Sequence, residues 1–96
     1  MIDNIKWLQD WYFSQCDGDW EHIQGVKITT IDNPGWYFEL NVTETNLDGK
    51  VFENIKIEHD DNDWLYCKVE NNMFVGTGGP LNLDEIIVIF REWASS

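Results

Sequence analysis

The chain has 96 residues, the length of one domain, and carries 18 Asp and Glu against 6 Lys and Arg, a formal net charge of −12. This balance argues against binding to nucleic acid or to an anionic membrane surface, because both recruit cationic side chains. It favours a basic partner and fast, salt-sensitive association, although such charge can also serve solubility alone. Six Trp, three Tyr and five Phe are many for one small core, so some should lie at the surface.

The amino-terminal residues 1–6 lack the basic and apolar regions of a secretory signal, and no apolar run approaches membrane-spanning length. Two cysteines, Cys16 and Cys67, are too few for a disulfide framework. We therefore expect a cytoplasmic protein with a single domain over residues 1–96 and no membrane contact.

The first expected element is a helix over residues 3–15. Ile5, Leu8, Trp11 and Tyr12 recur at the spacing of one helix face, and Asp3 is available as the N-cap.

A two-residue period then predicts five strands, over residues 26–30, 36–42, 51–58, 64–70 and 73–75. Pro34-Gly35 fits the central pair of a type II turn, and Asp48-Gly49 and Asn71-Asn72 suit further turns. The polar residues 59–63 are expected to form a loop. Because these signals follow one another at short spacing, an antiparallel meander is the most economical topology.

Residues 76–80, rich in glycine, are expected to end the sheet. Asn82 and Glu85 then resemble a capping box before an apolar helical stripe. The β-branched run at residues 86–89 favours a strand instead, but the cap and the length favour a helix. The predicted fold is α+β: a five-stranded antiparallel meander sheet flanked by an N-terminal and a C-terminal helix, which pack on one face of the sheet.

Two acidic segments, each adjoining a tryptophan, are the candidate functional residues. In the first, Asp17, Asp19 and Glu21 alternate around Trp20. These carboxylates could bind calcium, although the glycine and the distal glutamate of a calcium loop are misplaced. They could instead cap backbone amides in a charged turn, or they could contact a partner.

The second acidic segment holds three further carboxylates directly before another tryptophan. Asp60, Asp61 and Asp63 precede Trp64. Taken alone, this segment favours a solvated hairpin with Trp64 turned into the core. Together with the first segment it suggests a partner-binding face, since aromatic side chains anchor and charges steer association.

Sites of other kinds have little support. His22, His59, Cys16 and Cys67 lack the short spacing of zinc ligands, and no base is placed beside a serine. The glycines of residues 76–79 lack the lysine or the full spacing of a phosphate-binding loop. We therefore predict no catalytic residue, no metal and no cofactor.

Several blocks carry a resemblance to a known family. They are Trp7-Leu8, Trp11-Tyr12, Gln15-Cys16-Asp17-Gly18-Asp19-Trp20-Glu21-His22, Gly25-Val26, Asp32-Asn33-Pro34-Gly35-Trp36, Asp63-Trp64 and Phe90 with Trp93. With these blocks, which span nearly the whole chain, the sequence resembles the immunity protein 53 family of bacterial polymorphic toxin systems. The resemblance implies a cytoplasmic, non-enzymatic protein that binds the toxin of its own system, and it supplies no contact residues.

The expected function is that of an antitoxin that occludes a basic, nuclease-type toxin. Its expected contact residues are Asp17, Asp19, Trp20, Glu21, Asp60, Asp61, Asp63 and Trp64. The alternatives are a small ligand-binding or enzymatic domain that uses Asp19, Glu21 and His22, and an acidic mimic of nucleic acid that binds a host protein. An exposed sheet edge could also pair two copies as a homodimer.

Overall fold

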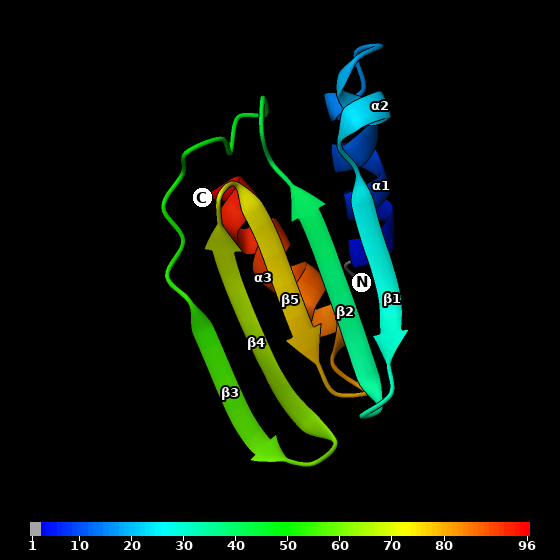
Figure 1. The fold of residues 1–96 in the computed structure, drawn as a ribbon, viewed down its shortest axis with the longest axis vertical. Helices are drawn as coiled ribbons and strands as arrows, with labels where there is room; N and C mark the ends of the chain where they lie inside the picture. The colour runs from blue at the N-terminus through cyan, green and yellow to red at the C-terminus, as the bar shows by residue number, and fades with distance from the viewer. Residues whose placement is uncertain (1–2) are drawn as a thin grey trace.

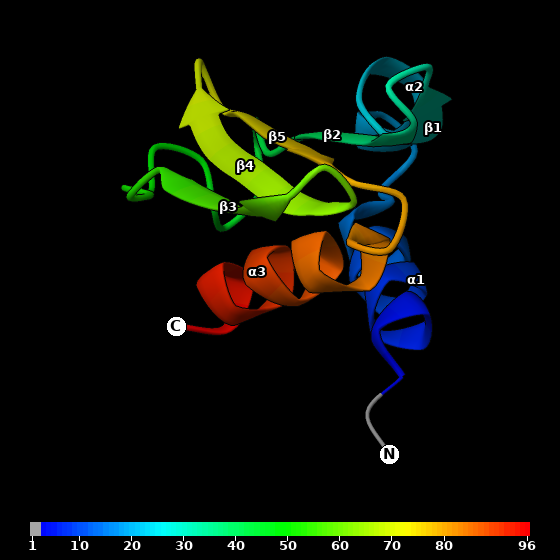
Figure 2. The same cartoon turned by 90° about the horizontal axis from the view of Figure 1, so that it is seen from below.

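A sheet of five antiparallel strands carries two long helices on one of its faces in the computed structural model, which describes residues 3–96 (Figures 1 and 2). The elements follow one another as α1 (Asn4–Gln15), α2 (Trp20–Ile23), β1 (Val26–Ile31), β2 (Gly35–Asn41), β3 (Ile55–Asp60), β4 (Asp63–Glu70), β5 (Met73–Gly78) and α3 (Leu83–Ser95). The predicted α+β fold, with five antiparallel strands between two helices, is confirmed. The short helix α2 was not predicted.

The strand order is β1-β2-β5-β4-β3, so the simple meander order is wrong. Strand β5 lies between β2 and β4, and the connection from β2 to β3 crosses to the far edge of the sheet (Figure 1). This connection is held against the β4–β5 turn, because the Asn72 side chain accepts from the Gly49 amide at 2.9 Å and donates to Asp48 at 2.9 Å. These contacts between residues distant in sequence fix the crossover.

The prediction that the glycines at residues 76–79 end the sheet is wrong for Gly76 and Gly78. Both belong to β5 and continue the strand. Gly76 lies opposite Phe38 on one side and Cys67 on the other. A Cβ atom at Gly76 would lie 2.3 Å from Cγ2 of Ile86, so the missing side chain lets α3 approach the centre of the sheet.

The predicted type II turn at Pro34-Gly35 is also wrong. Gly35 is the first residue of β2, pairs with Ile31 and has no positive φ. A Cβ atom there would lie 2.2 Å from the carbonyl oxygen of Gly78, so glycine is required for strand packing. The Asn33–Pro34 peptide bond is cis.

The β3–β4 hairpin is tighter than its polar sequence suggests. Strand β3 begins at Ile55 and runs to Asp60, and β4 begins at Asp63, which leaves a two-residue turn where a loop over residues 59–63 was predicted. The backbone pairing of β3 and β4 therefore extends into the acidic segment. The predicted turn at Asn71-Asn72 is confirmed, and both residues have positive φ.

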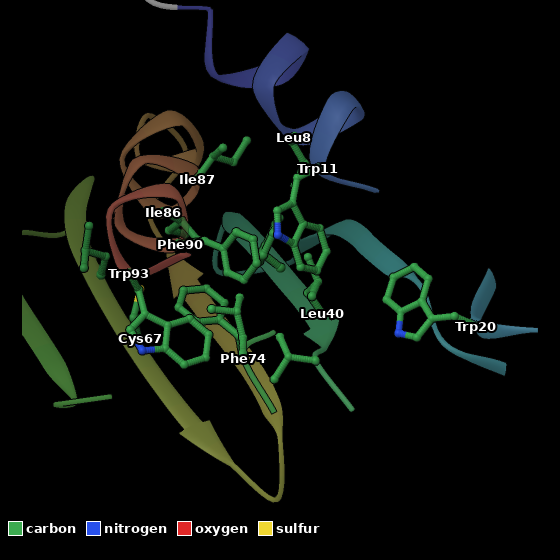
Figure 3. Close-up of a cluster of buried hydrophobic side chains, with 14 residues drawn as sticks. Leu8, Trp11, Trp20, Leu40, Cys67, Phe74, Ile86, Ile87, Phe90 and Trp93 are labelled. Atoms are coloured by element: carbon green, nitrogen blue, oxygen red, sulfur yellow. The ribbon is translucent and has the colours of Figure 1, made fainter. Parts of the chain in front are cut away.

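The core lies between the sheet and the two long helices (Figure 3). Phe90 of α3 is its centre: the ring meets Trp11 of α1 edge-on at 5.1 Å and Phe74 of β5 at 5.1 Å. Because α1 and α3 both pack on this face, the other face of the sheet stays open (Figure 2).

A side chain caps the start of α1, but none caps the start of α3. The Asp3 side chain accepts from the Lys6 amide at 2.9 Å, as predicted for an N-cap. Asn82 precedes α3, but its side chain makes no capping hydrogen bond to the helix backbone. It bonds instead to residues of β4, described below.

Candidate functional site

Two carboxylates of the first acidic segment accept hydrogen bonds from backbone amides of the same segment. Asp17 Oδ1 accepts from the amides of Trp20 at 3.0 Å and Asp19 at 2.9 Å, and the Glu21 carboxylate accepts from the amides of Asp17 and Gly18. The Trp20 amide, followed by that of Asp19, lowers the pKa of Asp17. The pKa of Glu21 is lowered by its own amide and by those of Asp17 and Gly18. These two carboxylates organise the turn into α2.

Trp20 belongs to the core and is not a surface residue. Only 3% of it is exposed, its indole Nε1 donates to the carbonyl of Thr43 at 3.0 Å, and its ring packs edge-on against Trp11. Figure 3 shows it at the edge of the aromatic cluster. In the first segment, therefore, the exposed groups are the charged ones, and Trp20 fixes the turn that presents them.

The second acidic segment borders the open face of the sheet through Asp60, Asp61 and Trp64. Strand alternation places Trp64 and Tyr66 of β4 on this face, and Glu58 of β3 lies directly opposite Trp64. A hollow of about 610 Å³ opens here between the β3–β4 hairpin and the β1–β2 turn. It is lined by Asn33, Glu58, His59, Asp60, Asp61, Trp64 and Tyr66.

The aromatic wall of this hollow already holds one cation of the chain itself. The rings of Trp64 and Tyr66 lie 5.5 Å apart, and Lys56 Nζ lies 5.5 Å from the centre of the Tyr66 ring. The Tyr66 hydroxyl donates to Glu58. This bond, followed by the charge of Lys56, lowers the pKa of Glu58, and it raises the pKa of Tyr66. Aromatic faces and a fixed carboxylate thus stand together, as a site for a cation requires.

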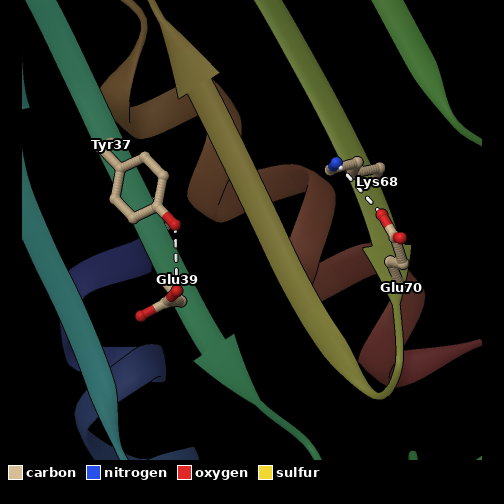
Figure 4. Close-up of polar contacts among 4 residues, drawn as sticks. All are labelled: Tyr37, Glu39, Lys68 and Glu70. Carbon is tan, nitrogen blue, oxygen red and sulfur yellow. Dashed lines mark hydrogen bonds and ion pairs between the residues drawn. The ribbon is translucent and has the colours of Figure 1, made fainter.

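Elsewhere on the open face, carboxylates have partners within the chain (Figure 4). The Tyr37 hydroxyl donates to Glu39 at 2.9 Å, and Lys68 pairs with Glu70 at 3.2 Å. At the rim of the hollow, by contrast, neither Asp60 nor Asp61 takes part in an ion pair within residues 3–96. The negative charge available to a partner on this face is therefore concentrated at the β3–β4 hairpin.

Asn82 fixes the hairpin relative to α3. It is 2% exposed, and its Nδ2 donates to Asp63 at 3.0 Å and to Glu85 at 3.0 Å. Its Oδ1 accepts from the Trp64 amide at 3.3 Å. Asp63 is thus a half-buried structural carboxylate that helps to hold Trp64 in place, while Asp60 and Asp61 are exposed.

Residues 3–96 contain neither a metal-binding cluster nor a helix that could span a membrane. Within residues 3–96, no three His, Cys, Asp or Glu side chains gather in a way that could hold a metal ion. Burial raises the pKa of the Cys67 thiol to about 12, which makes it a poor nucleophile. None of the helices in the described part of the chain is long and apolar enough to cross a membrane.

A family model described as immunity protein 53 matches residues 5–95. The chain belongs to the immunity protein 53 family. No curated protein and no solved structure matches it. Membership supports an immunity, or antitoxin, role, implies a toxin partner and suggests an inhibitor that is not an enzyme.

The structure separates the two acidic segments of this family member. The turn into α2 lies at one end of the long axis and the β3–β4 hairpin at the other (Figure 1). Four residues that line the hollow were not among the predicted contact residues: Glu58, His59, Tyr66 and Asn33. Tyr66 could have been found from its two-residue spacing to Trp64, whereas Glu58 and Asn33 required the strand register and the fold.

Proposed function

We propose that this member of the immunity protein 53 family is a cytoplasmic antitoxin that binds and occludes the basic, nuclease-type toxin domain of its own bacterial polymorphic toxin system. The observation that carries the proposal is the hollow at the β3–β4 hairpin. Trp64 lines it together with Asp60 and Asp61, two exposed carboxylates without ion-pair partners in residues 3–96, and with Glu58, which pairs with Lys56 at 3.5 Å. A nuclease cleft gathers Lys and Arg to bind phosphate, and an acidic surface competes for the same side chains.

In the proposed complex, a Lys or Arg side chain of the toxin enters the hollow. Its charge meets Asp60 and Asp61, and its apolar stem or guanidinium plane lies against Trp64. Trp64 acts as the anchor, and its truncation costs about 2 kcal/mol or more of binding energy. The two exposed carboxylates act mainly on the rate of association.

The first acidic segment has a different part in this mechanism. Asp17, Asp19 and Glu21 add to the negative field that steers the toxin toward the protein. Backbone amides lower the pKa of both Asp17 and Glu21, which favours their charged forms. Trp20, which is buried, keeps these groups in position and does not touch the toxin.

The proposal is tested by the association kinetics of the toxin domain encoded next to this gene, measured at low and at high salt. Asp60→Asn with Asp61→Asn removes two charges at the hollow, and the amide oxygen at position 60 can still accept from Asn62. We expect association to slow by about five-fold at low salt, with a weaker salt dependence.

The matched control removes two charges at other exposed sites, through Glu53→Gln with Glu92→Gln. This pair changes the net charge by the same amount and should slow association by less than about two-fold. Equal effects of the two pairs would mean that only net charge matters and would contradict a site at the hollow. Trp64→Ala should raise the dissociation rate by about thirty-fold, provided that the variant remains folded.

A further inference from the structure

A second surface of the molecule combines an apolar groove with an open strand edge. The groove, of about 410 Å³, runs between α1 and β1 and is lined largely by apolar side chains. Three of them are well exposed for their type: Ile5 at 48%, Ile28 at 39% and Tyr12 at 36%. Exposed apolar side chains that gather along one groove indicate an interaction surface.

Within residues 3–96, strand β1 forms one edge of the sheet and has β2 as its single neighbour (Figure 1). In an antiparallel pair, every second residue of an edge strand directs its amide and carbonyl away from its neighbour, where they can bond to another strand. The sequence of β1, Val-Lys-Ile-Thr-Thr-Ile, is rich in β-branched residues and carries one charge, that of Lys27. Such an edge is well suited to accept a further strand.

We propose that an extended segment of the toxin adds to the sheet beside β1 and places alternate apolar side chains in the groove between α1 and β1. The proposal rests on the proposed function, since it assigns a second contact to the same toxin. Val26 and Ile28 lie on the helix side of the sheet, because they pair with Leu40 and Phe38 of the core. Every second side chain of an added strand points to that side as well, which matches the apolar groove.

The net negative charge of this chain favours a basic partner at the groove over a second copy of the chain. Each copy carries a net charge of −12, so two copies that met edge to edge would repel each other. The chain from the N-cap of α1 through β1, which forms both walls of the groove and the turn between them, carries Asp3, Asp10, Asp17, Asp19 and Glu21 against Lys6 and Lys27. We therefore expect Lys or Arg on the toxin segment beside its apolar residues. This gives the first acidic segment a defined place in the complex.

Hydrogen exchange of the β1 amides, with and without the purified toxin domain, distinguishes strand addition from simple covering. In the free chain, every second amide of β1 should exchange fast, because it has no partner strand. In the complex these amides should slow by at least about tenfold, which leaves the whole of β1 protected. If the toxin slows the exchange of all β1 amides equally, or of none of them, strand addition is overturned.

Groove variants give an independent test of the same contact. Ile5→Ser and Ile28→Ser change exposed side chains and should leave the fold intact, whereas Val51→Ser changes an 84% exposed side chain remote from the groove and serves as the control. Each groove variant should raise the toxin dissociation rate by about five-fold or more without changing the salt dependence, and the control should not.

The outcomes separate the two proposals. A toxin that binds the wild-type chain and both groove variants equally well would overturn the added strand and leave the antitoxin function standing. A toxin that does not bind the wild-type chain would overturn both. A free chain whose dimerisation is abolished by Ile28→Ser would assign the groove to a second copy and would also overturn the added strand.

Discussion

Replacement of Trp20 by alanine should destabilise the fold strongly, although this residue stands in an acidic surface segment. Its ring is 3% exposed and contacts Trp11 and Tyr12, with ring centres 6.0 and 5.8 Å away. Removal of a buried aromatic side chain costs about 3–5 kcal/mol of unfolding free energy. Because Trp20 lies at the edge of the core, where the site can partly collapse, we expect a loss near about 3 kcal/mol.

Two further variants give this loss of unfolding free energy a comparison, one at the same position and one on the open face of the sheet. Trp20→Phe keeps an aromatic ring but removes the hydrogen bond to the Thr43 carbonyl, and it should cost about 1 kcal/mol for that bond. Trp64→Ala, at a half-buried position on the open face, should cost less than Trp20→Ala. Urea unfolding measures all three. A loss below about 1 kcal/mol for Trp20→Ala, together with a larger loss for Trp64→Ala, would refute the assignment of Trp20 to the core.

Two other predictions concern the sheet and the turn into α2. Gly76→Ala should cost about 1–3 kcal/mol by forcing Ile86 and α3 away from the sheet, whereas the control Gly25→Ala, where an added Cβ meets nothing within 4 Å, should change stability by less than about 0.5 kcal/mol in urea unfolding. Asp17 and Glu21 have lowered pKa values in the folded chain, so their contribution to stability is fully present above their unfolded pKa values of about 4 and is lost as pH falls through the folded ones. Asp17→Asn with Glu21→Gln should therefore flatten the fall in stability as the pH drops below about 4, and an unchanged pH profile would contradict this role.

The two long helices and most strands could be predicted from the sequence because local signals decide them, whereas the four-residue helix α2 was not predicted. Asp3 caps α1 as expected, and the two-residue period marks the strands. The long apolar stripe of α3 outweighs the β-branched run at residues 86–89, since the stripe packs against the sheet. Local preference and tertiary packing agree in these elements.

The strand order could not be predicted, because it depends on contacts between distant residues. Glycine at 76 and 78 suggested a break, yet both residues belong to the central strand β5. A Cβ atom would lie 2.3 Å from Ile86 at position 76, and 3.1 Å from Ile86 and from the Trp64 carbonyl oxygen at position 78. Asn72, which was expected only to form a turn, also holds the crossing connection through Asp48 and Gly49. Neither role leaves a periodic signal in the sequence.

The candidate site was predicted in part. The composition of both acidic segments was informative, but it could not show which tryptophan faces solvent. Trp20 is buried because a short helix turns it toward Trp11, and Trp64 stands on the open face because of the strand alternation that also buries Leu65. A partner surface depends on such orientation as much as on residue type.

Survival of a test bacterium that expresses the toxin domain encoded next to this gene, with and without this chain, tests the central claim most directly. We expect the chain to rescue the cells and to co-purify with the toxin, and we expect Asp60→Asn and Asp61→Asn combined with Trp64→Ala to weaken both effects. Death of both cultures, with both proteins soluble, would show that this chain does not neutralise that toxin.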